Sequence, residues 1–214
     1  FSSDDYTRYN AAQTIYKKEV KAINQLVRDG MDRKFSNGFL EAIELILKDD
    51  KIDDSFRAYL LQIPGEKLLF DEFENFDFVN TRSTLNFMCK TIGEEFKEVF
   101  MSRLNNYSIG EEYSLSPSEI AKREMLNFSM YYIACTEDKD ALEKIYNIFS
   151  NVNNMTIEFG ALTALAARPN ELGEKASQEF YTKWKQETLV IQKWFSLQAS
   201  LESVNIDKVE NLSE

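Results

Sequence analysis

Apolar side chains recur at helical spacing along almost the whole chain. Between residues 4 and 30 they return every three or four positions, which predicts a first helix that Gly30 ends in a left-handed cap. The same spacing predicts further helices at 39–47, 53–60, 66–73, 79–92, 96–104, 117–135, 138–149, 156–167, 172–184 and 189–199, and one more beginning at Ile206. No segment shows the strict alternation of a half-buried strand, so we expect an all-α fold.

Several polar residues mark where these helices begin and end. The clearest start is Ser116-Pro117-Ser118-Glu119, which places a serine at the N-cap, proline at the first helical position and glutamate three residues on. Asp53 or Asp54 is suited to cap the helix that follows it. Gly93 is expected to break or bend the pattern, so that two helices meet near it.

About ten short helices joined by brief connections favour an irregular α-solenoid, a superhelix of antiparallel helix pairs of the HEAT or armadillo kind. We find no strict sequence period, which weakens the case for regular repeats without excluding paired helices. The length of 214 residues fits a single helical domain over residues 1–214.

Composition excludes several fold classes, active-site types and partners. Only 7 glycines and 3 prolines occur, too few for a turn-rich β architecture. The chain has no histidine, which excludes His-ligated zinc sites and Ser-His-Asp triads within it. With 25 basic and 36 acidic residues the net charge is −11, and such a chain repels phosphate backbones, so we expect no nucleic-acid partner.

The sequence also predicts a soluble, cytoplasmic protein without a membrane partner. Cys89 and Cys135 each lie in an apolar helical pattern, where a free buried thiol is the common case. No apolar run approaches the roughly 18 residues of a membrane span, and the first ten residues lack the basic and apolar regions of a signal peptide.

Acidic residues offer the only candidates for metal or acid–base chemistry. Asp49, Asp50, Asp53 and Asp54 suggest calcium, but the segment lacks the glycine and distal glutamate of an EF-hand, which favours a solvated capping loop. The pairs Glu94–Glu95 and Glu111–Glu112 lack any sign of the burial that acid–base catalysis requires. No two glycines are closer than eight residues, which excludes a glycine-rich phosphate loop. We therefore predict no catalytic, cofactor-binding or metal-ligating residue in this chain.

Aromatic residues gather near the C-terminal end. Phe180 and Trp184 are four apart, and Val190, Trp194 and Leu197 form a helical stripe, so each set is expected to mark a buried helix face. Core packing explains these sets better than a ligand cage does, and we expect both tryptophans to be substantially buried.

Five segments, in the same order, resemble the C-terminal helical domain of bacterial-type aminopeptidase N, a zinc metallo-aminopeptidase family also called alanyl aminopeptidase. These segments are DDYTRYNAAQ at 4–13, FRAYLLQIPGE at 56–66, EIAKREMLN at 119–127, NNMTIEFGALTALAA at 153–167 and FYTKWKQETLVIQKWFSLQAS at 180–200. Together they extend over essentially the whole chain.

The resemblance implies a non-catalytic helical domain of a hydrolase. Members of the family bind zinc through a His-Glu-x-x-His helix and a distal glutamate in an upstream domain, and remove N-terminal residues from peptides. The helical domain arches over that catalytic domain and restricts substrate access to an enclosed cavity. The implied partners are thus the upstream catalytic domain of the same polypeptide and peptide substrates, and zinc belongs to the parent enzyme alone.

One departure from the family concerns the C-terminal side. In the family the helical domain continues beyond the stretch that matches NIDKVENL, so we expect this chain to be a fragment truncated there, and we carry no substrate-contacting residue over. The alternative is a free-standing helical-repeat module that binds a protein partner. A zinc-binding helix encoded upstream in the same gene would favour a fragment of an aminopeptidase over the free-standing module.

Overall fold

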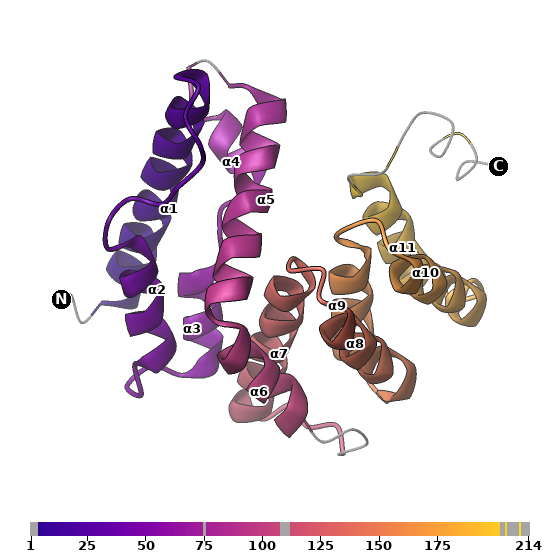
Figure 1. The fold of residues 1–214 in the computed structure, drawn as a ribbon. Helices are drawn as coiled ribbons and strands as arrows, with labels where there is room; N and C mark the ends of the chain where they lie inside the picture. Colours follow the sequence, from indigo (N-terminus) through magenta and orange to yellow (C-terminus); the bar gives the residue numbers. More distant parts are fainter. Residues whose placement is uncertain (1–3, 75, 108–111, 202–203, 205–209, 211–214) are drawn as a thin grey trace. The chain divides into compact units, whose positions relative to one another are not determined.

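The computed structural model describes residues 4–74, 76–107, 112–201, 204 and 210. Eleven helices and no strand lie in this described part (Figure 1), which confirms the all-α prediction. The helices are α1 (Asp5–Arg28), α2 (Phe39–Lys48), α3 (Asp54–Leu61), α4 (Glu66–Phe70), α5 (Phe78–Glu95), α6 (Lys97–Asn106), α7 (Pro117–Ala134), α8 (Lys139–Asn151), α9 (Met155–Ala166), α10 (Glu171–Trp184) and α11 (Thr188–Ser200). The helix expected from Ile206 lies outside the described residues.

Contacts divide the chain into two compact units. The first unit contains residues 1–96 and 116–125, and the second contains residues 97–115 and 126–214. Helix α7 therefore contributes its first half to one unit and its second half to the other. This division does not test the expectation of a single domain over 1–214, which stays a prediction.

In the first unit, α1 is the central helix and packs against α3 and α5. Val20 and Ile23 on α1 are completely buried, and Met88 and Ile92 on α5 are almost completely buried. Helix α2 continues this core through Ile43 and packs on α3. The amphipathic spacing of the sequence therefore produces one shared core for helices that lie far apart along the chain.

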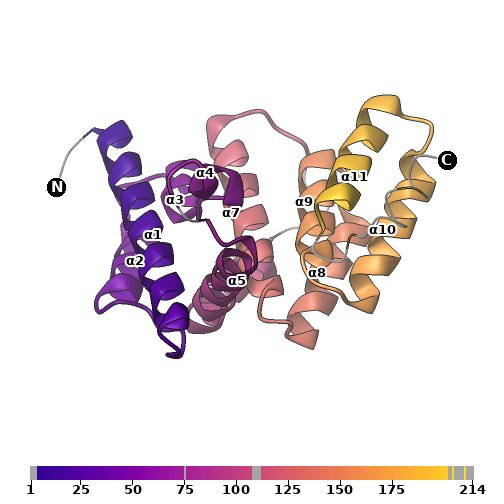
Figure 2. The ribbon, with the colours of Figure 1, turned by 90° about the horizontal axis from the view of Figure 1, so that it is seen from above.

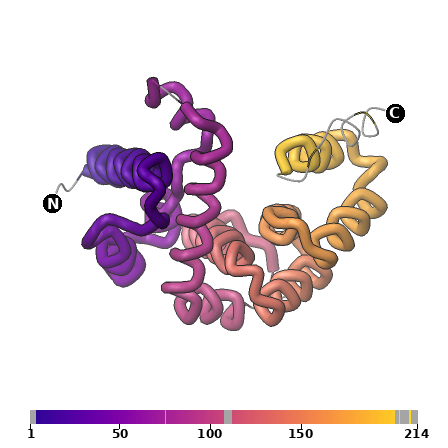
Figure 3. Tube along the Cα trace, turned by 45° about the horizontal axis from the view of Figure 1, so that its top comes forward, coloured from indigo at the N-terminus to yellow at the C-terminus, as the bar shows by residue number. Residues whose placement is uncertain are grey.

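In the second unit, α8, α9, α10 and α11 follow one another through connections of three or four residues (Figure 3). Helix α9 packs on both α8 and α10, and α11 packs on α10 (Figure 2). Ile157, Ala161 and Leu165 of α9 are fully buried, as is Phe180 of α10. Short connections that bring consecutive helices into contact are the arrangement expected for helical repeats.

Side-chain caps explain where most helices start. Asp53 caps α3 by accepting a hydrogen bond from the Phe56 N–H at 2.9 Å, and Asp138 caps α8 through the Ala141 N–H at 3.0 Å. Ser116 accepts from the Glu119 N–H at 3.4 Å at the start of α7, as its sequence predicts. Gly30 has a φ of +72°, which confirms the left-handed end predicted after α1.

Two helices meet near Gly93, as predicted, but the junction lies three residues beyond it. Helix α5 continues through Gly93 to Glu95, and the chain turns at Phe96, whose N–H donates to the Ile92 carbonyl at 3.1 Å. A single glycine costs a helix only about 1 kcal/mol relative to alanine, and the burial of Ile92 and Phe96 outweighs that cost.

The two tryptophans are half-buried. Their side chains are therefore more exposed than those of the buried helix faces predicted from their spacing. Each indole N–H has a partner, because Trp184 donates to Glu158 at 3.0 Å and Trp194 donates to the Ser177 hydroxyl at 3.0 Å. Gln198, instead of an aromatic residue, is the buried residue of α11. A polar contact thus anchors α11 on α10.

Among the residues that the structure describes, no helix is both long enough and apolar enough to cross a lipid bilayer.

Candidate functional site

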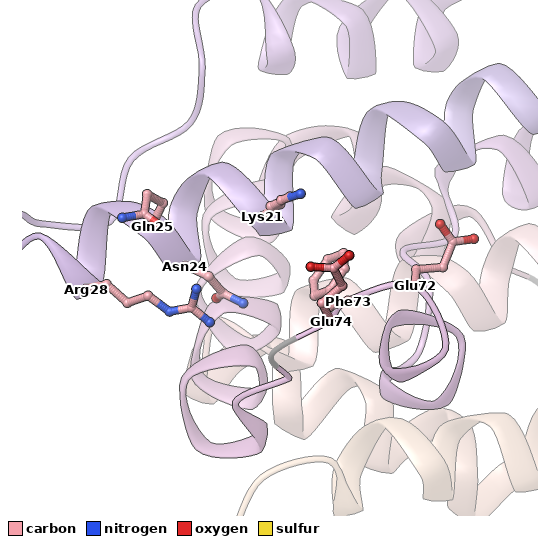
Figure 4. A pocket seen from close by; sticks show the side chains of 7 residues that line it. All are labelled: Lys21, Asn24, Gln25, Arg28, Glu72, Phe73 and Glu74. Atoms are coloured by element: carbon pink, nitrogen blue, oxygen red, sulfur yellow. The ribbon is translucent and has the colours of Figure 1, made fainter.

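A pocket of about 360 Å³ lies in the first unit, between α1 and the connection that joins α4 to α5. Lys21, Asn24, Gln25 and Arg28 line it along α1, and Figure 4 shows Glu72, Phe73 and Glu74 of the connection on its other side. The pocket thus combines residues that lie about fifty positions apart in the sequence.

The helical repeat of α1 places its share of the lining. Lys21, Gln25 and Arg28 are separated by four and three residues, so they lie along one face and their side chains are exposed. Asn24 lies deeper, and its amide is bound on both sides: its nitrogen donates to Thr81 at 2.9 Å, and its oxygen accepts from Thr84 at 2.7 Å. Asn24 is therefore a fixed, structural part of the pocket.

Ion pairs hold the opposite wall. Lys17 of α1 pairs with Glu72, which ties the connection to α1. Arg82 of α5 pairs with both carboxylate oxygens of Glu66, the second through an Nη2–Oε2 contact of 2.6 Å, which ties α4 to α5. A bidentate pair of this kind fixes orientation as well as distance. The wall is therefore positioned by contacts at both of its ends.

The pocket is suited to ion pairing. Two cations, Lys21 and Arg28, lie on α1, and two carboxylates, Glu72 and Glu74, lie on the connection. The lining contains no serine, cysteine or histidine, so it holds no Ser-His or Cys-His pair. Its charges suit a ligand that carries both a positive and a negative group.

A second hollow, of about 390 Å³, is an apolar groove between α1 and α2. Ala11, Ile15, Ala42 and Leu45 contribute to its lining, and small alanines leave the space that larger side chains would fill. Arg8 lies at the groove, where its Nη2 is 3.4 Å from the Asp49 carboxylate. This groove also offers packing surface instead of catalytic groups.

The acidic cluster of the sequence is a capping and pairing loop. Asp53 caps α3, and Asp54 pairs with the buried Arg57. Arg57 also donates to the Asp49 carbonyl at 2.7 Å and to the Ile52 carbonyl at 3.2 Å. These contacts confirm the interpretation of the segment as a capping loop. No group of three or more potential metal-ligating side chains occurs within the described ranges of the chain.

The other candidates from the sequence remain apart from the pocket. Glu94, Glu95 and Glu112 are exposed, as expected, and Glu111 lies outside the described residues. Cys89 and Cys135 are free and buried, which confirms the predicted thiols. Burial raises the pKa of the Tyr16 phenol well above its ordinary value, and the nearby Cys89 adds to this shift, so Tyr16 stays protonated in the core.

Sequence inspection did not identify the pocket because its residues are ordinary surface charges when taken one by one. Only the fold brings Lys21 and Arg28 opposite Glu72 and Glu74. The one available signal was the segment from Phe70 to Phe78, where acidic and aromatic residues alternate.

Comparison with protein families gives one match that spans the chain. The family described as "Domain of unknown function (DUF3458_C) ARM repeats" matches residues 1–214. ARM repeats are helical repeats, so this match agrees with the predicted armadillo-like fold class.

The chain is also similar to aminopeptidase N from two bacteria. Aminopeptidase N of Escherichia coli K12 is 28% identical over 204 residues, which is 95% of this chain and 23% of that enzyme. Aminopeptidase N of Haemophilus influenzae is 26% identical over 213 residues, which is 99% of this chain and 24% of that enzyme. The chain therefore spans about a quarter of the length of these relatives.

A solved structure shares the fold. The crystal structure of Legionella pneumophila aminopeptidase A in complex with aspartic acid superimposes with a TM-score of 0.80 at 20% identity, over 100% of this chain and 25% of that one. This helical fold is thus found within a larger protein.

Proposed function

This chain belongs to the DUF3458_C family of ARM repeats, and from that premise we propose that it is the C-terminal helical part of a zinc aminopeptidase, an enzyme that removes N-terminal residues from peptides. The observation that carries the proposal is the similarity to aminopeptidase N over 95–99% of this chain, although the chain spans only 23–24% of each enzyme.

In this proposal the zinc belongs to the catalytic part of the enzyme. The residues of this chain do not fit a zinc site of that family, because the sequence contains no histidine at all. The pocket at α1 likewise has no histidine or cysteine within its lining. The chain therefore acts without taking part in the chemical step.

The role that remains is to cover the active site and to restrict which substrates reach it. A helical wall over a zinc site excludes bulk water, which strengthens the electrostatic contacts that hold a charged α-amino group. A narrow opening admits peptide ends and excludes bulky folded proteins. The partners in this proposal are the catalytic part of the same polypeptide and peptides that enter the cavity.

The proposal places the enzyme in the cytoplasm. Both cysteines are free and buried, and a reducing compartment keeps such thiols unpaired.

The gene provides the first test. We expect the reading frame that encodes this chain to encode a His-Glu-x-x-His helix upstream, and the full-length protein to release N-terminal residues from aminoacyl reporters in a chelator-sensitive manner. A reading frame without that helix would favour the free-standing protein-binding module.

A second test addresses access to the active site. The full-length enzyme should cleave an N-terminal residue from a short peptide and from an unfolded protein, but much more slowly from the same residue fused to a tightly folded domain. Equal rates on the folded and unfolded substrates would contradict the covering role while leaving the peptidase activity intact.

A further inference from the structure

Four phenylalanines gather where α4 is connected to α5. Phe70 ends α4, Phe78 begins α5, and Phe73 and Phe76 lie between them. The ring centroids of Phe76 and Phe78 are 4.6 Å apart, those of Phe70 and Phe76 are 5.5 Å apart, and those of Phe70 and Phe78 are 5.7 Å apart. We call these four residues the phenylalanine surface.

Two phenylalanines of this apolar surface are exposed, and Phe73 and Phe76 are half-buried. Phe70 is 52% exposed and Phe78 is 58% exposed, and the neighbouring Val79 is 82% exposed. Contiguous exposed apolar side chains in a soluble protein usually mark a site of contact with another protein surface. Phenylalanine is among the residues that contribute most area at such contacts, about 150–250 Å² each.

Contacts within the first unit position the residues of this surface. Its rings contact one another, Asp77 caps α5 through the Asn80 N–H at 2.9 Å, and the Arg82–Glu66 pair holds α4 against α5. A partner would therefore meet aromatic rings that already contact one another.

The charges around the phenylalanine surface indicate which kind of partner surface would bind it. Asp71, Glu72, Glu74 and Asp77 alternate with the phenylalanines, and no basic residue occurs between Lys67 and Arg82. Glu72 already pairs with Lys17, and Asp77 caps α5. In the described part of the chain no ion pair involves Asp71 or Glu74. A complementary surface would be apolar at its centre and basic at its edge.

We propose that the phenylalanine surface docks this chain onto an apolar surface with a basic edge in the catalytic part of the same polypeptide. This inference rests on the proposed function and adds the place of contact to it. Contacts between domains of one polypeptide typically bury roughly 600–1,500 Å² and combine apolar and polar groups, as this surface does. The apolar groove at α1 and α2 carries no comparable set of unpaired charges, since Arg8 and Asp49 in its lining pair with each other.

Thiol labelling in the full-length protein tests the inference. Phe78→Cys places a thiol on the phenylalanine surface, and Tyr59→Cys places one at a matched position, because Tyr59 is 54% exposed and lies outside the surface. The native thiols of Cys89 and Cys135 are buried and give a slow background. Labelling at each site is measured by mass spectrometry in the native protein and is normalised to its rate in denaturant.

We expect the thiol at position 78 to react more slowly than that at position 59 by on the order of tenfold, because a docked site is labelled only when the contact opens. The double charge reversal Asp71→Lys with Glu74→Lys should restore fast labelling at position 78. Equal rates at positions 78 and 59 would overturn the inference, and so would protection that disappears on dilution, because the occupant would then be a second copy.

The activity of the same preparations separates this inference from the proposed function. Aminopeptidase activity together with fast labelling at position 78 would reject the docking surface alone. A full-length protein without any aminopeptidase activity, or a gene that encodes no catalytic part, would reject the proposed function. The catalytic part proposed to contact the phenylalanine surface would then be rejected as well.

Discussion

The buried carboxylate of Glu158 accepts a hydrogen bond from the indole nitrogen of Trp184 at 3.0 Å. The same carboxylate oxygen lies 2.9 Å from the ammonium nitrogen of Lys183. Glu158 is only 3% exposed, so this one side chain of α9 satisfies two donors from the end of α10. The pair fixes how two consecutive helices meet in the second unit.

Replacing that acceptor should destabilise the second unit. Glu158→Ala leaves the indole N–H without its partner, and an unsatisfied buried donor costs about 1–3 kcal/mol. We expect a loss of that size in denaturant unfolding and a shift of tryptophan emission to longer wavelength.

Glu158→Gln provides the control, because its amide oxygen keeps an acceptor at nearly the same place. It should retain more than half of the stability that Glu158→Ala loses. Equal losses in both variants would show that the negative charge, and not the bond to Trp184, is what stabilises this contact.

The helices of this protein can be predicted from local sequence, whereas the contacts between them cannot. The Asp53 and Ser116 caps were predictable because a cap depends on residues within one turn. Trp194 was expected to pack on an apolar face, but its indole binds Ser177 of α10, seventeen positions earlier. Periodicity shows which face of a helix is apolar, but it does not show which neighbouring helix that face meets.

The same reasoning explains why sequence did not predict the pocket or the exact position of the junction between α5 and α6. Lys21 and Glu72 belong to separate elements, and neither has a local pattern that distinguishes it from other surface charges. Gly93 carries a strong local signal for a break, but tertiary burial of Ile92 and Phe96 overrides it. Sequence therefore predicted the element types, whereas the pocket depends on contacts between elements that local sequence does not show.

A second prediction concerns the buried polar cluster between α1 and α5. Thr84 is completely buried and donates to the Asn24 side-chain oxygen at 2.7 Å. Thr84→Val keeps the shape of the side chain but removes the donor, so we expect it to cost about 1–3 kcal/mol in denaturant unfolding. The exposed Thr182, whose hydroxyl bonds within its own helix, provides the control. Thr182→Val should change stability by less than about 0.5 kcal/mol.

A third prediction concerns close packing at the start of α10. A Cβ on Gly173 would overlap the carbonyl oxygen of Leu165 and lie 3.0 Å from its carbon, and backbone atoms cannot move aside cheaply. Gly173→Ala should therefore destabilise the protein by about 1–3 kcal/mol, as overpacking of a core does.

Gly65→Ala is the matched control for this substitution. A Cβ there would meet nothing within 4 Å, and the φ of −71° suits any residue. We expect this variant to unfold within about 0.5 kcal/mol of the parent protein. A stable Gly173→Ala variant would mean that α9 and α10 separate easily.

The last prediction links a helix cap to pH. Asp138 caps α8 and also pairs with Lys97, whose ammonium nitrogen is 2.6 Å from the carboxylate. The bond from Lys97 and the cap bond from the Ala141 N–H lower the pKa of Asp138 below its ordinary 3.8. A carboxylate whose pKa is lower in the folded protein stabilises the fold above its unfolded pKa, and this contribution is lost as the pH falls through the folded pKa. Asp138→Ala should therefore cost about 0.5–2 kcal/mol at pH 7, the usual value of an N-cap.

The same comparison at low pH makes the prediction specific to the charge. The difference in unfolding free energy between the parent protein and Asp138→Ala should shrink as the pH falls below about 4, because the parent carboxylate then becomes protonated and loses its attraction for Lys97. Asp138→Asn keeps a capping oxygen but cannot ionise, so its stability relative to Asp138→Ala should stay constant over this range. Urea unfolding of the three proteins between pH 7 and pH 3 measures both trends. If the parent and Asp138→Asn lose stability in parallel, then the cap geometry alone, without the charge, stabilises the start of α8.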